Sequence, residues 1–275
     1  MHSASQSALD HAEDQLEQVV SDESTGSAEH LAQVSQELYA VADVLGQHIE
    51  LRRHLVDPTG SASLRRSLVD NLFSDKVDET TAQLLTTLVE TRLTSPTDLV
   101  EAVEILGRTA ALASAEKDDT LSDTEDDLFR FGRILQREPQ LRTLLADSSA
   151  PVDKRLELLA QVAGEKVTPT AYRLLEQAVR HPYSKALDHA AERLADAAAA
   201  RRDRSIARVV APIALSDEQE ERLGDVLSRL YGRSISVQSD VDPDILGGLV
   251  VRVGGELLDG SVARHLRGAA DAFPT

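Results

Sequence analysis

A stretch of helical sequence occurs twice in this chain, at a constant separation of 90 residues. Residues 38–89 and residues 128–179 align without a gap, and fourteen of the 52 positions are identical. Half of the identical positions are leucines, and an aromatic ring is kept at Tyr39/Phe129. A repeat of this length is much longer than the units that stack in solenoids. The pattern therefore predicts two copies of one helical domain.

Apolar residues at intervals of three and four predict the helices of both copies. The first copy is expected to contain helices over residues 5–20, 28–47, 49–56, 61–73 and 78–93, and a long helix over about 97–117 is expected after the break at Ser95-Pro96-Thr97. The second is expected to contain helices over residues 122–137, 139–146, 151–163, 168–180 and 184–202. Aromatic residues make up only 3% of the chain, so Leu, Val and Ala must fill the cores, which suits helical bundles.

The spacing of apolar residues changes after residue 204, which indicates a different kind of domain. Residues 206–213 are typical of a strand, and Pro212 predicts a sheet edge or a strand end. Ser216 and Gln219 form a capping-box pattern at the start of a helix to about Tyr231. Alternation over residues 234–238 predicts a second strand. We therefore expect an α+β protein that is mainly α, with helical copies at 1–95 and 96–204 and a small α/β domain at 205–275.

The segment over residues 242–262 consists of turn residues around short strands. Proline fixes φ, and glycine adopts positive φ at little cost, so these residues set the path of the backbone. Asp242-Pro243 predicts a turn, and Gly247-Gly248 predicts a bulge or a close approach of the backbone. Gly254-Gly255 predicts a two-residue hairpin turn. Asp259-Gly260 predicts a further turn, and Ser261 predicts the cap of a last helix. The motif is built for geometry rather than for chemistry.

The chain offers no recognised pattern for catalysis, for a cofactor or for a metal. The glycine pairs lack the Lys-Ser/Thr of a P-loop and the spacing of a dinucleotide fingerprint. The acidic residues at 118–127 lack the alternating ligands of an EF-hand. The eight histidines are scattered, and cysteine is absent. We therefore predict no catalytic residue, no cofactor and no metal site.

The net charge of −18 limits the classes of partner. Nucleic acids and anionic lipid surfaces both require clustered Lys and Arg, so neither is expected. No run of 18 apolar residues is present, and direct membrane insertion is not expected. Residues 121–205 carry fourteen acids and fourteen bases. This neutral block either faces an acidic partner or reflects ordinary variation of surface charge.

The order and spacing of Asp-Pro, Ile-Leu-Gly-Gly and Asp-Gly-Ser in the C-terminal motif resemble the delta subunit of F-type ATP synthases. The mitochondrial oligomycin-sensitivity-conferring protein belongs to the same family. The resemblance implies a non-catalytic subunit of the peripheral stalk, on the cytoplasmic side of the cell membrane. It implies that the bundle binds the N-terminal helix of alpha on the catalytic head, and that the C-terminal domain binds the C-terminal helices of b.

The duplicated helical region departs from the short form of this family, which has a single bundle. Residues 147–154 of the second copy look like the family's Pro-x-x-x-Lys region, and Asp57-Pro58 of the first copy is also similar to it. Which copy binds alpha is therefore open. The alternative function is a helical adaptor unrelated to ATP synthase, which would not co-purify with the catalytic head. A soluble acidic hydrolase is a third class.

Overall fold

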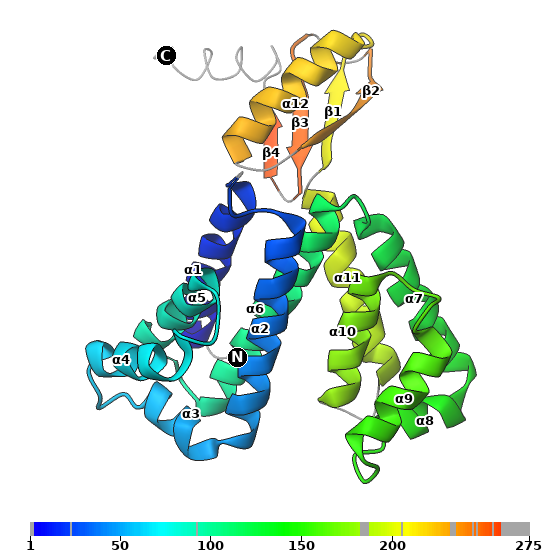
Figure 1. Cartoon of the computed structure of the whole chain (residues 1–275). Coiled ribbons are helices and arrows are strands. Elements are labelled where there is room, and N and C mark those ends of the chain that lie inside the picture. The colour runs from blue at the N-terminus through cyan, green and yellow to red at the C-terminus, as the bar shows by residue number, and fades with distance from the viewer. Residues whose placement is uncertain are drawn as a thin grey trace, which may run out of the picture. The chain divides into compact units, whose positions relative to one another are not determined.

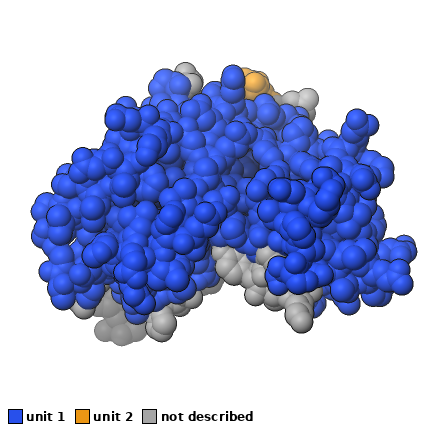
Figure 2. All heavy atoms as spheres, turned by 60° about the horizontal axis from the view of Figure 1, so that its bottom comes forward, with its two compact units in different colours: residues 1–196 blue, residues 197–275 orange. Residues whose placement is uncertain are grey.

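The computed structural model describes residues 3–22, 24–91, 93–181, 187–204, 206–231, 235–243, 245, 247–254 and 256–259. The chain divides into two compact units (Figures 1 and 2), residues 1–196, here the helical unit, and residues 197–275, here the C-terminal unit. The predicted fold class, mainly α with a small α/β part, is confirmed. The predicted boundaries at residues 95 and 204 stay predictions, because one compact unit can hold two copies of a fold.

The first copy begins with a long helix and ends with another (Figure 1). Its helices are α1 Ser3–Ser21, α2 Ala28–Gln47, α3 Ile49–Val56, α4 Ala62–Phe73, α5 Glu79–Glu90 and α6 Pro96–Lys117. Serines set three of the helix starts, because their hydroxyls accept free N–H groups of the first turn. These serines are Ser27, Ser61 and Ser95.

The second copy repeats the same order of elements. Its helices are α7 Leu121–Arg137, α8 Pro139–Ala146, α9 Val152–Ala163, α10 Pro169–Arg180 and α11 Leu187–Arg204. The limits of α8, α9 and α10 lie 90 residues after those of α3, α4 and α5. One contact recurs as well, because the N–H groups of Asp78 and Thr168 each donate to a carboxylate at 2.7 Å, from Glu37 and Asp127 respectively.

An arginine shared by the two copies anchors the end of a helix in each. In the first copy, Arg65 donates to the carbonyl of Val89 near the end of α5 at 2.6 Å. In the second copy, Arg155 is buried and donates to the carbonyl of Val179 near the end of α10. A cation at a helix C-terminus satisfies carbonyls that have no partner within the helix and favours the helix dipole. This contact explains why the repeat keeps arginine here.

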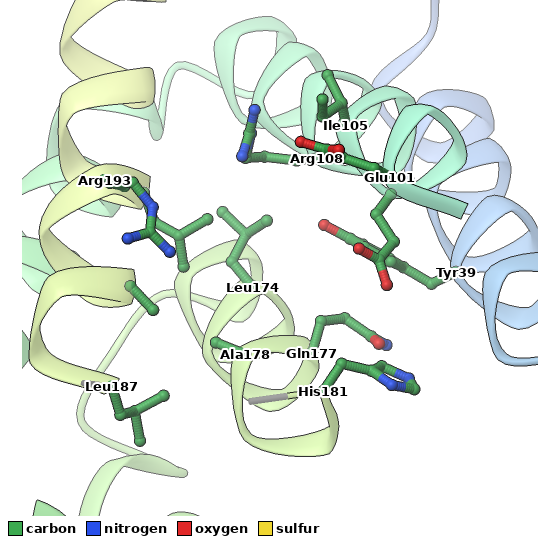
Figure 3. A pocket seen from close by; sticks show the side chains of 13 residues that line it. Tyr39, Glu101, Ile105, Arg108, Leu174, Gln177, Ala178, His181, Leu187 and Arg193 are labelled. Atoms are coloured by element: carbon green, nitrogen blue, oxygen red, sulfur yellow. The ribbon is translucent and has the colours of Figure 1, made fainter. Parts of the chain in front are cut away.

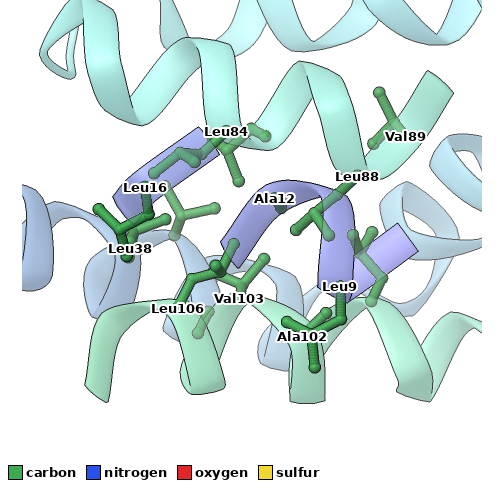
Figure 4. Packing of buried hydrophobic residues seen from close by; sticks show 14 of the residues in the cluster. Leu9, Ala12, Leu16, Leu38, Leu84, Leu88, Val89, Ala102, Val103 and Leu106 are labelled. Atoms are coloured by element: carbon green, nitrogen blue, oxygen red, sulfur yellow. The ribbon is translucent and has the colours of Figure 1, made fainter. Parts of the chain in front are cut away.

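Helix α6 packs against helices of both copies. It contacts α1, α2, α3 and α5 of the first copy and α7 and α10 of the second. Its apolar stripe lies in the core of the first copy, facing α1 (Figure 4), and consists of Leu99, Ala102, Val103, Leu106, Ala110 and Ala113. Each of these side chains is at most 1% exposed. The two copies are therefore joined through a shared helix rather than through a flexible linker.

The C-terminal unit contains the end of α11, the helix α12 Asp217–Tyr231 and a four-stranded sheet. The strands are β1 Ile206–Ala211, β2 Ser236–Val241, β3 Val250–Val253 and β4 Glu256–Asp259, in the order β2-β1-β3-β4. Strand β1 pairs parallel with β2 and antiparallel with β3, and β4 pairs antiparallel with β3. Apolar residues of β1, β3 and α12, with Ile235, form its core.

The start of α12 and the end of β1 were both predicted from local sequence signals. The capping box is confirmed, because the N–H of Ser216 donates to Gln219 Oε1 at 2.9 Å and the N–H of Gln219 donates to Ser216 Oγ at 3.3 Å. The alternative that Pro212 marks a sheet edge is wrong, since β1 is a central strand. Pro212 follows the last residue of β1, where its missing N–H breaks no ladder. The predicted last helix lies outside the described residues.

Candidate functional site

The start of the glycine-rich motif lies directly after β2. The N–H of Asp242 donates to the carbonyl of Ala211 at 2.8 Å, so the parallel pairing of β1 and β2 continues to this residue. The N–H of Ile245 donates to the carbonyl of Asp242 at 3.2 Å, which closes a turn around Pro243. The proline fixes its own φ and thereby directs the chain out of β2.

Three glycines of the motif have positive φ, which side chains disfavour. The φ angles are 141° at Gly247, 83° at Gly248 and 55° at Gly254. Gly254 follows β3, where Val253 pairs with Glu256 across the turn into β4. Asp259 is the last residue of β4. Gly255, Gly260 and Ser261 lie outside the described residues, so their predicted role stays a prediction.

The motif positions main chain rather than reactive groups. Its described glycines allow the connection from β2 to β3 and the tight turn from β3 to β4, both of which need a backbone that L-residues rarely adopt. Within the described ranges, no group of three or more His, Cys, Asp or Glu residues is arranged to hold a metal ion. In the same residues, no helix is long and apolar enough to cross a bilayer.

A cavity of about 550 Å³ lies in the helical unit (Figure 3), between α6, α10 and α11. Apolar side chains from α10 and α11 line one part of it, namely Leu174, Ala178, Leu187, Ala190 and Leu194. Charged and polar groups line the rest, namely Glu101, Glu104, Arg108, Gln177, His181 and Arg193, together with Ile105 and the ring of Tyr39. An apolar surface with a charged margin is typical of grooves that bind amphipathic helices.

A polar contact between the two copies borders this cavity. His181, which follows α10, pairs with Asp43 of α2 through its Nε2, and both side chains are half-buried. The hydrogen bond to Asp43 raises the pKa of His181, although burial opposes the change. Burial raises the pKa of Glu104 on α6 to about 7, with the nearby His181 acting in the opposite direction. The junction of the copies therefore contains a carboxyl group and an imidazole whose pKa values are both raised.

The repeat explains why the cavity exists. Leu9, Ala12 and Leu16 of α1 lie 90 residues before Leu99, Ala102 and Leu106 of α6, so α6 is the counterpart of α1. Both sets of side chains are buried in the same core, that of the first copy (Figure 4). Helix α6 therefore turns its other face, with Glu101, Glu104 and Arg108, toward α10 and α11. The first copy has α1 packed in its core, whereas the second copy has no equivalent apolar helix at this place.

Sequence reasoning did not identify this cavity. Its lining residues come from four helices and from both copies, and no local motif contains them. The one signal was in the helix predicted over residues 97–117, whose charged residues interrupt an apolar pattern at Glu101, Glu104 and Arg108. Because α6 contacts helices of both copies, two of its faces carry structural information.

Comparison with known proteins gives matches along nearly the whole chain. A family model described as "ATP synthase delta (OSCP) subunit" matches residues 23–106 and 109–273. The ATP synthase subunit delta of Streptomyces griseus is 38% identical over 269 residues, which are 98% of this chain and 98% of that protein. The ATP synthase subunit delta of Salinispora arenicola is 40% identical over 243 residues, covering 88% and 89%. A Mycobacterium sp. (strain KMS) protein named "ATP synthase subunit b-delta" is 39% identical over 247 residues, which are 90% of this chain and 56% of that protein.

Proposed function

Because the chain belongs to the ATP synthase delta (OSCP) subunit family, we propose that it is a stator subunit of an F-type ATP synthase. In this role it ties the catalytic head, made of alpha and beta subunits, to the membrane-anchored b subunits. Rotation of the central stalk exerts torque on the head, and the stator holds the head still. The chain itself supplies rigid protein rather than a reacting group, and it is held at the cytoplasmic side of the cell membrane by its partners.

The observation that carries this proposal is a match to delta subunits of nearly the same length, covering 98% of the chain and 98% of a Streptomyces relative. A stator must resist deformation, and close-packed helices meet this need better than loops do. The shared helix α6, buried along its apolar stripe, links the two copies in this way. The name of the Mycobacterium relative joins b to delta, which supports b as a direct partner.

We assign the cavity between α6, α10 and α11 to the N-terminal helix of an alpha subunit, and the C-terminal unit to the C-terminal helices of b. The cavity is the place in the second copy where the apolar helix is missing. An amphipathic helix laid over it would bury its apolar side chains against Leu174, Ala178 and Leu194. Its polar side would meet the charged margin, as in other helix-in-groove complexes.

The proposed function is tested by affinity purification from native membranes. Alpha, beta and b chains are expected to co-purify with the tagged protein, and deletion of the protein is expected to abolish proton-driven ATP synthesis in membrane vesicles. Recovery without any of these chains would favour the helical adaptor instead. Pure protein that hydrolyses ATP would favour the hydrolase, whereas the stator role predicts no turnover.

The assignment of the alpha site is tested by titrating an alpha N-terminal peptide into the full-length chain. We expect Ala178→Glu, which places a charge in the cavity, to weaken binding by about tenfold or more. Ala160→Glu, on an exposed position of α9, is the matched control and should bind as the unmodified chain does. Equal binding by the Ala178→Glu protein would remove the cavity as the alpha site without removing the stator role.

A further inference from the structure

Helix α7 of the second copy exposes an aromatic side chain in a protein that has few. Phe129 is 57% exposed and Ile134 is 43% exposed. The other face of α7 is buried by its neighbours and carries Leu128, Phe131, Gly132 and Leu135. A large exposed phenylalanine is a feature that interaction surfaces share, whereas Ile134, five residues further along, lies on another side of the helix.

The internal repeat shows what the equivalent surface does in the first copy. Tyr39 of α2 is the counterpart of Phe129, and it is only 8% exposed. Its ring lies against Gly107 of α6, where an added Cβ would come within 3.3 Å of it. One turn further along α2, Asp43 pairs with His181 at the end of α10. In the first copy, this surface therefore receives the end of a helix.

The charge of this surface is reversed in the second copy. The residue 90 positions after Asp43 is Arg133, one helical turn after Phe129. Arg137 lies a further turn along the same stripe, and Arg130 lies beside it. All three arginines are exposed. Arg130 pairs with Asp126 at 3.3 Å, and Arg133 bonds only to the neutral side chain of Gln136 in the contacts described.

We propose that Phe129, Arg133 and Arg137, here the α7 face, form a docking surface for an acidic amphipathic helix of a partner protein. An apolar side chain of the partner would cover Phe129, as the first copy's aromatic ring is covered. Carboxylates one and two turns away would pair with Arg133 and Arg137, because guanidinium groups bind carboxylates with two parallel hydrogen bonds. This surface is separate from the cavity, so the inference does not depend on the proposed alpha site.

The charge reversal also makes a second copy of this chain an unsuitable occupant. On α2 the acceptor is the carboxylate of Asp43, and the incoming group is His181. If α10 of another molecule approached α7 in the same way, His181 would meet the guanidinium of Arg133. The pairing with a carboxylate that holds His181 in the first copy could not form there, because a guanidinium group only donates hydrogen bonds. The contact that α10 makes with α2 inside one molecule is therefore disfavoured between α10 of one molecule and α7 of another.

The test uses two synthetic helical peptides that share one leucine stripe and differ only in their flanking charges. One carries Glu and the other carries Lys, and each is titrated into the isotope-labelled full-length chain. The acidic peptide is expected to shift the amide signals of α7 and to bind about tenfold more tightly than the basic peptide, since two exposed ion pairs contribute roughly this much. Equal affinities, or shifts elsewhere without shifts in α7, would overturn the inference.

Substitutions separate docking from non-specific attraction to a peptide. Phe129→Ala should weaken binding of the acidic peptide by about tenfold. Arg133→Asp, which restores the acid found in the first copy, should remove the preference for the acidic peptide, because one acid and one base then remain on the α7 face. Leu64→Ala, at a 56% exposed position of α4, is the control and should change neither affinity. Self-association that Phe129→Ala abolishes, measured by sedimentation without peptide, would identify the face as a contact between copies and would contradict the proposal.

Discussion

Gly248 illustrates how one residue without a side chain determines the path between two strands. Its φ of 83° is one that β-branched residues avoid, and it lies two residues before β3. We predict that Gly248→Val destabilises the C-terminal unit by about 1–3 kcal/mol. The measurement is hydrogen exchange of the β1 and β3 amides in the full-length chain, which reports on this sheet directly.

Gly46 offers a matched control for the same kind of change. It lies in α2 with nothing within 4 Å of an added Cβ, and its φ is not positive. Gly46→Ala should therefore be neutral or stabilise the helical unit by up to about 1 kcal/mol, since alanine is the better helix former. If Gly248→Val left the exchange of β3 unchanged, the positive φ would not be needed there.

Glu104 and His181 give the junction between the copies a dependence on pH. Burial raises the pKa of Glu104 to about 7, and the Asp43 hydrogen bond raises that of His181. A pKa raised by folding means that the folded state holds the proton more tightly. Both groups therefore favour folding at low pH and lose this contribution as pH rises, Glu104 between about 4.5 and 7 and His181 as pH passes its raised pKa. We predict that the helical unit becomes less stable from pH 5 to pH 8.

Two substitutions separate the contributions to this pH dependence. Glu104→Gln, which cannot ionise, should raise stability at pH 8 by about 1 kcal/mol, because the side chain is only partly buried and water screens part of the effect. It should also flatten the pH profile of chemical denaturation. Glu101→Gln, which removes a nearby charge that contributes to the raised pKa of Glu104, should flatten the profile only slightly. A profile that stays steep after Glu104→Gln would assign the dependence to His181 or to another group.

At the scale of whole helices, the core of the first copy includes side chains of α6. It supplies a stripe of side chains, each at most 1% exposed, to the same core as α1 and α2. We predict that residues 1–117 fold cooperatively and that residues 1–95 do not, because removing α6 would expose most of the apolar surface of α2. Circular dichroism with thermal melting distinguishes the two. A cooperative transition for residues 1–95 would show that α6 is dispensable for this core.

The individual helices were easier to predict from sequence than their arrangement. Leucine spacing, serine caps and prolines located α3, α8, α9 and α10 to within a residue or so, since these signals are local. The sharing of α6 was not predicted, because a repeat offset shows which helices correspond but not which core each one enters. The cavity was missed for the same reason. His181 and Asp43 meet across 138 positions of sequence, and no local pattern relates them.

At the scale of the whole molecule, one helix belongs to both compact units. Helix α11 runs from Leu187 to Arg204, and the division between the units falls after Asp196. The helix includes the alanines at 197–200, which have high helix propensity and favour an unbroken element at this point. A stator that transmits torque between two partners needs stiffness along the chain that joins its two binding parts. The proposed function therefore places a mechanical demand on α11.

This demand can be tested by making α11 flexible between the two units. Insertion of Gly-Gly-Ser after Ala200 should leave both units folded and both sets of partners bound, because Gly/Ser segments act as flexible joints rather than as unfolding elements. Proton-driven ATP synthesis in membrane vesicles should fall, while ATP hydrolysis by the head persists. The same insertion after Thr59, an exposed residue in the loop between α3 and α4, is the control and should leave synthesis unchanged. Full synthesis with the α11 insertion would show that stiffness between the units is not what the complex requires of this chain.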